Sequence, residues 1–237
     1  MIRINLISGP RNISTALMYS FAQRRDTTVL DEPFYAFYLR QSGAQHPGKE
    51  DVMRAQPPDD QEVYRNVYGT WSTPVLFIKN MAHHLELMNE AQLADLTNVF
   101  LIRNPRQILA SYAQVIEAPT LRDIGIEYQA SLFKRLREQG HTPLVIDAGT
   151  VVEQPEVVLR MLCNRIGIPF MTAMLQWPAG PKPYDGVWAS HWYANVHQST
   201  GFSRQTTSDR PLPPYLDSLN SLAQRHYEVM LPFSLRP

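Results

Sequence analysis

The sequence has a single cysteine, no net charge and no long hydrophobic run. One cysteine among 237 residues excludes an internal disulfide and fits a reducing, cytoplasmic compartment. The 22 basic residues balance the 22 acidic residues, so no net field favours nucleic acid or an anionic membrane. No apolar run reaches the roughly 20 residues that a membrane-spanning helix needs. We therefore expect a cytoplasmic protein with neither a nucleic acid nor a membrane as partner.

What the chain does contain suits one α/β domain over residues 1–237. Hydrophobic residues make up 44% of the chain, which is enough for a sizeable core. Strand-like apolar stretches alternate with helical stretches. This pattern predicts a three-layer sandwich, in which a central parallel sheet of about five strands has helices on both faces. The predicted strands are residues 2–7, 27–30, 75–79, 98–103 and 143–147, and the main predicted helices are 14–25, 106–117, 120–139 and 214–229.

Two segments stand apart from this alternation, and within the second of them residues 177–186 are expected to form an ordered but irregular loop. Residues 42–60 form a polar insertion rich in Gly, His, Pro, Asp and Lys, which is predicted to be mobile or to act as a lid. Residues 171–237 form a tail rich in proline and aromatic residues. Its aromatic side chains either lock the tail onto the domain, or stack on a purine or shape an acceptor pocket. The aromatic residues in question are Trp188, Trp192, Tyr193 and Phe202.

The segment after the first strand predicts an anion-binding site. The strand leads through Ser8-Gly9 into Pro10-Arg11-Asn12-Ile13-Ser14-Thr15, where a Ser-Thr pair opens a helix. Backbone N–H groups and hydroxyls at a helix N-terminus attract anions, and the arginine adds a positive charge. The Gly-Lys-Ser/Thr ending of a Walker loop is missing, so an ordinary ATPase or GTPase is not indicated. The candidate phosphate-binding residues are Pro10, Arg11, Asn12, Ile13, Ser14 and Thr15.

Other polar residues also stand at the ends of predicted strands. The carboxyl ends of parallel strands meet at one edge of a sheet, and ligands bind there. Arg103 ends a strand, Pro105 starts the next helix, and Ser111 lies two turns along that helix. A planar guanidinium at such a place suits a phosphate. The polar residues expected at this edge are Arg11, Glu32, Lys79, Arg103 and Asp147.

Together these segments resemble the sulfotransferase superfamily, whose donor is 3′-phosphoadenosine 5′-phosphosulfate. Pro10–Thr15 occupies the place of that family's 5′-phosphosulfate loop, and Arg103-Asn104-Pro105 with Ser111 is similar to its 3′-phosphate signature. The order and spacing agree over roughly residues 4–170. The downstream part of the match is Ile146-Asp147-Ala148, Pro155 and Gly167-Ile168-Pro169-Phe170.

The resemblance identifies the chain as a divergent, bacterial-type member and implies its chemistry. It implies a P-loop nucleoside triphosphate hydrolase-like fold, 3′-phosphoadenosine 5′-phosphosulfate as co-substrate, and no metal. Asp31-Glu32-Pro33 resembles the Glu-Pro context of family branches that act on carbohydrates, so Glu32 is the predicted base. Arg11 and Lys79 are predicted to neutralise charge that grows during transfer. The alternative is that Asp31 or Glu32 only caps the helix that follows Pro33.

The chain departs from the family pattern at three places. Arg11 stands where the family has Lys, and Ile13 stands where it has Gly. Lys79-Asn80-Met81 replaces the Lys-Thr-His that supplies a histidine base in cytosolic members. His83 and His84 follow closely, but we expect them to lie on the surface or to cap a helix start.

Two other interpretations of the function stay open. One is an ATP-dependent P-loop small-molecule kinase that uses magnesium. The other is a non-catalytic nucleotide-binding protein on the same fold. The acceptor is expected to be a small molecule or a carbohydrate, and the aromatic content of 10% suits either a homodimer face or a core. Its pocket is expected to involve residues 34–73 and the tail, with candidates Tyr35, Tyr38, Arg40, Tyr64 and Trp71.

Overall fold

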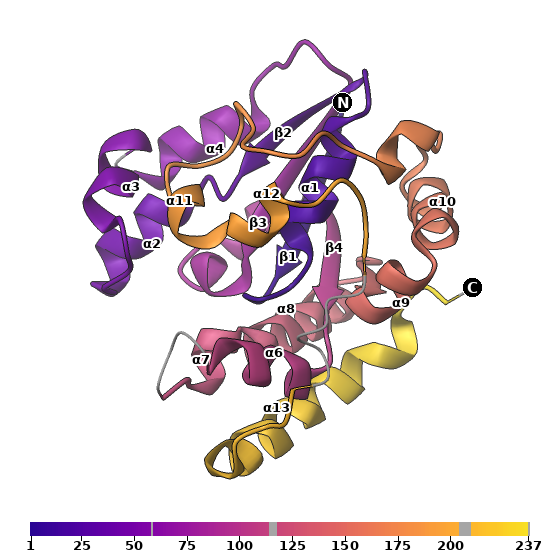
Figure 1. The fold of residues 1–237 in the computed structure, drawn as a ribbon. Helices are drawn as coiled ribbons and strands as arrows, with labels where there is room; N and C mark the ends of the chain where they lie inside the picture. The colour runs from indigo at the N-terminus through magenta and orange to yellow at the C-terminus, as the bar shows by residue number, and fades with distance from the viewer. Residues whose placement is uncertain (58, 114–117, 204–209, 237) are drawn as a thin grey trace.

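The computed structural model describes residues 1–57, 59–113, 118–203 and 210–236. Within these residues, five parallel strands form one central sheet in the order β2-β3-β1-β4-β5 (Figure 1). This confirms the predicted three-layer α/β architecture. The strands are β1 (Ile2–Ser8), β2 (Thr27–Asp31), β3 (Val75–Met81), β4 (Thr97–Ile102) and β5 (Leu144–Asp147).

Alternate residues of the strands feed two cores on opposite faces of the sheet. Ile7 and Phe100 belong to one hydrophobic cluster, whereas Leu6 and Phe77 belong to the other. Side chains alternate across a strand, so a strand that is apolar throughout needs a helical layer on each face.

Longer helices supply both layers. The first cluster receives side chains from α4 (Asp60–Tyr68), α6 (Pro105–Tyr112), α8 (Ile126–Glu138) and α13 (Asp217–Met230). The second receives them from α1 (Ser14–Ala22), α9 (Ala148–Glu153) and α10 (Pro155–Ile166). The remaining elements are α2 (Tyr35–Ser42), α3 (Lys49–Ala55), η1 (Ala82–Leu85), α5 (Glu90–Ala94), α7 (Leu121–Ile124), η2 (Thr172–Leu175), α11 (Ala189–Trp192), α12 (Ala194–His197), η4 (Pro214–Leu216) and η5 (Leu231–Phe233).

Some predicted helix boundaries are wrong. The helix predicted over 120–139 is two helices, because Gly125 has a φ of 70° and left-handed residues end helices. A Cβ at this position would lie 3.1 Å from the Cβ of Ala82, so close packing also favours glycine here. The predicted helix 106–117 ends at Tyr112, and residues 114–117 lie outside the described part of the chain.

The polar insertion of residues 42–60 contains a helix, because Lys49–Ala55 forms α3 and Val52 is fully buried. The expectation that this insertion is mobile or acts as a lid stays a prediction.

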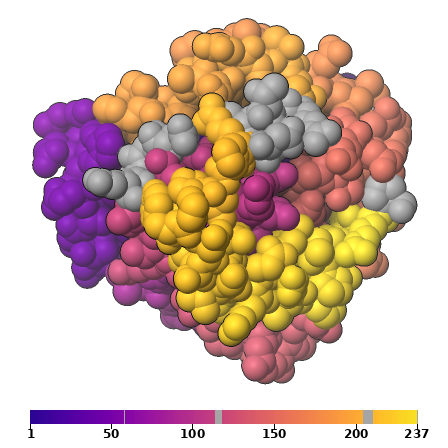
Figure 2. All heavy atoms as spheres, turned by 60° about the horizontal axis from the view of Figure 1, so that its bottom comes forward, coloured from indigo at the N-terminus to yellow at the C-terminus, as the bar shows by residue number. Residues whose placement is uncertain are grey.

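In the tail, Phe202 packs against the buried Trp177, with ring centroids 5.1 Å apart, and Trp188 and Tyr193 are buried in a cluster with Tyr35 of α2. The predicted role of the aromatic residues in attaching the tail therefore holds for Phe202, Trp188 and Tyr193. Figure 2 shows α13 on the outside of the molecule, at the face that Figure 1 has at its bottom. No described helix has the length and apolar character needed to cross a membrane.

Candidate active site

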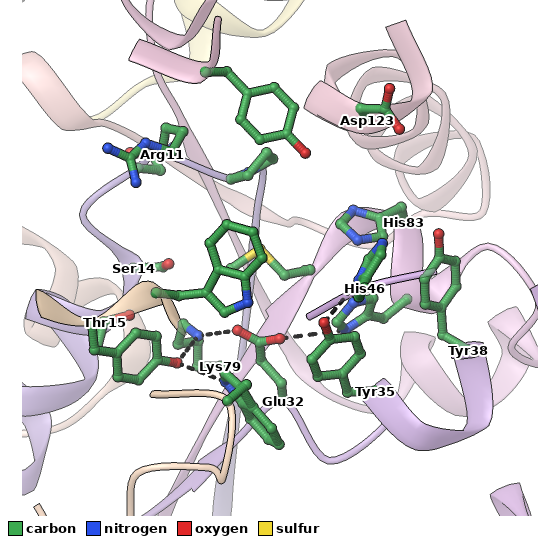
Figure 3. A pocket seen from close by; sticks show the side chains of 18 of the residues that line it. Arg11, Ser14, Thr15, Glu32, Tyr35, Tyr38, His46, Lys79, His83 and Asp123 are labelled. Carbon is green, nitrogen blue, oxygen red and sulfur yellow. Dashed lines mark hydrogen bonds and ion pairs between the residues drawn. The ribbon is translucent and has the colours of Figure 1, made fainter. Parts of the chain in front are cut away.

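A pocket opens at the carboxyl ends of β1, β2 and β3, beside the loop that joins β1 to α1 (Figure 3). Parallel α/β proteins bind ligands at this edge of the sheet. Further walls come from α2, from η1 and from the segment that contains α11 and α12. The predicted site residues that line the pocket are Pro10, Arg11, Asn12, Ser14, Thr15, Glu32 and Lys79.

Arg103 and Ser111 contact the loop through Arg11. The Nε of Arg11 donates a hydrogen bond to Oγ of Ser111 at 3.0 Å. The Nη1 of Arg103 donates to the backbone oxygen of Arg11 at 2.5 Å. Residues that are 100 and 92 positions apart in the sequence therefore meet at one place. Their binding of a nucleotide stays a prediction.

The N-terminus of α1 has no side-chain cap. Its N-cap residue is Ile13, and no acidic residue stands in its first turn. The side chain of Ile13 packs into the core, so only its backbone faces the loop. Asn12 shapes the loop instead, because its Oδ1 accepts from the N–H of Ile13 at 2.9 Å and its Nδ2 donates to the oxygen of Leu101 at 3.2 Å. An uncapped helix start beside an arginine suits an anion.

Glu32 belongs to a buried charged cluster at the ends of β2 and β3. Asp31 is paired with Lys79 in the strand register, so these two side chains lie next to each other. The side chain of Lys79 is 0% exposed, and its Nζ donates to Asp31 Oδ1 at 2.9 Å and to Glu32 Oε1. It also donates to the hydroxyl of Tyr193 at 2.7 Å. An ammonium has three protons, so these three partners use all of them.

Tyr193 connects the tail to this cluster. Its hydroxyl donates to the carboxylate of Asp31 at 2.8 to 2.9 Å and accepts from Nε1 of Trp188 at 3.1 Å. Both aromatic side chains line the pocket and pack against Tyr35 in α2. These two tail aromatics therefore shape the pocket, and its use by an acceptor stays a prediction. The role of Tyr193 as a partner of Lys79 was not predicted, because no sequence spacing links residues 114 positions apart.

Arg11 and Glu32 have strained backbones. Among the described non-glycine residues, these two have positive φ, at 53° and 42°. A non-glycine residue in this region costs about 1–3 kcal/mol, and such residues cluster at functional sites. The surrounding structure holds Glu32 in place, because its N–H donates to the oxygen of Lys79 at 2.8 Å and its carbonyl accepts from Nε2 of Gln56 at 2.9 Å. Gln56 follows α3, so the insertion supports the candidate base.

Burial sets the protonation of the central groups. Two carboxylates share one buried cation, and burial raises the pKa of Glu32 to about 7, with Lys79 opposing the rise and Asp31 adding to it. Burial lowers the pKa of His83 to about 3 and that of His84 well below its usual value. Near pH 7 both imidazoles are therefore neutral, while Glu32 is partly protonated.

His83 and His84 are not surface residues, and that prediction is wrong. Their side chains are 9% and 1% exposed, and both line the pocket. The ring of His84 is stacked between Tyr35 and Tyr38, with centroids 4.4 and 4.9 Å away, and its Nδ1 lies 3.6 Å from Glu32 Oε2. Figure 3 shows Arg11, Ser14 and Thr15 at one end of the pocket and this aromatic group at the other. The sequence offered one signal for this burial: Tyr35 and Tyr38 follow Glu32 and are three residues apart, so both lie on the same face of α2.

Several other candidates lie away from the pocket. Tyr64 belongs to the first hydrophobic cluster, and Trp71 packs against it. The guanidinium of Arg40 donates hydrogen bonds to the backbone oxygens of Pro57 and Met53. None of these three residues lines the pocket, and their contact with an acceptor stays a prediction. Asp147 caps α9 through the N–H of Thr150 and accepts from the hydroxyl of Tyr227 at 2.9 Å. Among the residues that the structure describes, no group of three or more His, Cys, Asp or Glu side chains is placed to hold a metal ion.

The sheet order and the loop before α1 define a P-loop-like α/β protein. A sulfotransferase domain model matches residues 2–232, and the chain belongs to this family. Two solved structures share the fold: the sulfotransferase domain of the Synechococcus PCC 7002 olefin synthase and a sulfotransferase from Alicyclobacillus acidocaldarius. Their TM-scores are 0.56 and 0.57 at 16% and 15% identity. The matches cover 100% and 98% of this chain and 96% of each structure.

Two curated relatives come from Arabidopsis thaliana. They are branched-chain-amino-acid aminotransferase-like proteins 1 and 2, which are 40% and 39% identical to this chain. The alignments cover 87% and 84% of this chain but 37% and 36% of the relatives. The chain thus spans a little over a third of the length of these relatives.

Proposed function

We propose that this protein transfers a sulfuryl group from 3′-phosphoadenosine 5′-phosphosulfate to a hydroxyl group of a small-molecule or carbohydrate acceptor. The observation that carries this proposal is the position of Glu32, a buried carboxylate in the same pocket as the loop before α1, where burial raises its pKa to about 7. A base with such a pKa is matched to proton transfer at neutral pH.

The donor set of the loop fits an anionic nucleotide. Arg11, Ser14 and Thr15 face the pocket, and the uncapped start of α1 presents backbone N–H groups beside them. Arg103 and Ser111 would hold the second phosphate at the back of Arg11. When bound, the donor supplies the sulfuryl group, and a phosphate of the nucleotide is the leaving group.

Glu32 and Lys79 have different roles in this proposal. Glu32 Oε1 is held by Lys79, whereas Oε2 faces the pocket near His84. Oε2 is therefore the atom that takes the proton of the acceptor hydroxyl. The predicted role of Lys79 as a charge neutraliser competes with its three present partners. We propose that Lys79 positions Glu32 and that Arg11 carries most of the charge stabilisation.

Calorimetric titration with 3′-phosphoadenosine 5′-phosphate tests the donor site. We expect a micromolar dissociation constant that Arg103→Ala raises by roughly tenfold or more, because a charge-assisted hydrogen bond is lost. Arg106→Ala is the matched control, since Arg106 is an exposed arginine three residues further along the chain, in α6. Binding of ATP with magnesium alone would favour the kinase hypothesis, and binding of neither nucleotide would contradict the proposed donor.

The pH dependence of turnover tests the base. Glu32 must be deprotonated to accept a proton, so kcat/KM should rise about tenfold per pH unit up to about pH 7 and level off above it. The measurement is the initial rate of sulfate transfer between about pH 5 and pH 9 at fixed ionic strength. A flat profile across pH 7 would exclude a group with this pKa from the rate-determining proton transfer.

A further inference from the structure

We propose that the aromatic end of the pocket is an acceptor subsite for an uncharged, largely apolar ring alcohol that carries a second hydroxyl-like group. The subsite is formed by Tyr35, Tyr38, His46, His83 and His84. The reacting hydroxyl lies at Glu32 Oε2, and the second polar group meets His83. This inference rests on the function proposed above and narrows its acceptor.

The charges near this end are already paired within the protein. Beyond the donor loop, the cations among the described lining residues are Lys79 and Arg122. Lys79 has its three partners, and Arg122 donates to Glu86 at 2.8 Å. The carboxylate of Asp123 accepts from the N–H and the hydroxyl of Thr120, both at 2.8 Å. A charged acceptor would lose hydration without finding an unpaired counter-charge, whereas a neutral acceptor avoids that cost.

Two polar groups of the aromatic walls are used internally, whereas Nδ1 of His84, 3.6 Å from Glu32 Oε2, has no hydrogen-bond partner among the described residues. The hydroxyl of Tyr35 is hydrogen-bonded to Nδ1 of His46 at 2.8 Å. The indole N–H of Trp188 is taken by Tyr193. A carbohydrate would bury several hydroxyls here, and each would need its own partner. A molecule with an apolar ring and few polar groups therefore fits these walls better than a sugar.

His83 supplies the second polar contact. Its ring lines the pocket, its side chain is more than nine-tenths buried, and its Nδ1 has no hydrogen-bond partner among the described residues. Its ring centroid lies 4.5 Å from that of His84, which in turn approaches Glu32. A neutral imidazole has one donor and one acceptor nitrogen, so a hydroxyl satisfies it in either tautomer. A ligand that pairs with this imidazole removes the cost of an orphaned polar atom.

Binding without donor tests the subsite directly. The probes are hydroquinone, phenol, glucose, 4-hydroxybenzoate and tyramine. The binding of each probe is measured by the quenching of tryptophan fluorescence, since Trp188 and Trp192 line the pocket. We expect hydroquinone to bind about tenfold more tightly than phenol, which is the effect of one neutral hydrogen bond, and more tightly than the sugar or the charged probes. His83→Phe should bring the ratio of hydroquinone to phenol affinity close to one. His141→Phe, at an exposed site, should keep the wild-type ratio.

The wild-type ranking needs no variant, so a His83→Phe protein that fails to fold leaves the test intact. Tighter binding of glucose or of a charged probe would overturn the inference. So would a hydroquinone preference that His83→Phe does not change. Hydroquinone binding as expected, without sulfate transfer to it in the presence of donor, would support the subsite and contradict the proposed function. Sulfate transfer to glucose but not to hydroquinone would contradict the subsite and support the proposed function.

Discussion

Glu32→Gln is expected to lower the turnover of sulfate transfer by roughly 10²- to 10⁴-fold, the usual contribution of a positioned general base. Glutamine has nearly the same shape as glutamate, and its amide oxygen can still accept from Lys79. It has no carboxylate to take the hydroxyl proton at the atom that faces the pocket. The measurement is kcat with the best acceptor from the panel, together with the dissociation constant of 3′-phosphoadenosine 5′-phosphate.

The two readouts separate chemistry from binding. Nucleotide affinity should stay within about twofold of wild type, because the loop before α1 does not depend on the charge of Glu32. Glu156→Gln is the matched control, since Glu156 is an exposed residue of α10 paired with Arg160. Full turnover in Glu32→Gln with intact nucleotide binding would remove Glu32 from the chemistry and leave it the role of a structural residue.

The fold was predictable because its strands are continuous apolar runs. The run from Val75 into Lys79 or from Asn98 to Ile102 cannot stay exposed, and helices between such runs require a parallel sheet covered on both faces. The predictions of helix boundaries failed where a turn interrupts a stretch with a helical pattern. Gly125 breaks a stretch with good helical periodicity, because its left-handed conformation and its approach to Ala82 outweigh the pattern.

The site was predictable only as far as strand ends and motifs reach. Arg11, Glu32 and Lys79 follow strands, and the parallel sheet brings them to one edge. The partner Tyr193 arrives from the tail, whose path has no period or motif. His83 was misjudged because polar residues at a turn are usually exposed, whereas here α2 covers them with tyrosines.

Lys79→Met is expected to lower the free energy of unfolding by about 3–5 kcal/mol near pH 8, because it leaves two buried carboxylates without their cation. Burial already raises the pKa of Glu32 above its unfolded value, and loss of the cation raises it further. Stability from such a group is present at low pH and is lost as pH rises through the folded-state pKa. The deficit should therefore shrink near pH 5, where Glu32 is protonated. Urea unfolding at both pH values measures this.

Two further variants give the charge interpretation a sharp test. Lys79→Met combined with Glu32→Gln leaves one buried carboxylate instead of two, so the double variant should recover part of the stability that Lys79→Met loses at pH 8. Lys134→Met, at a lysine whose side chain is 73% exposed, should change stability by no more than about 0.5 kcal/mol. If the deficit of Lys79→Met were equal at pH 5 and pH 8, lost packing rather than unpaired charge would be its cause. Lys79 would then support the sheet without holding the candidate base in its reactive form.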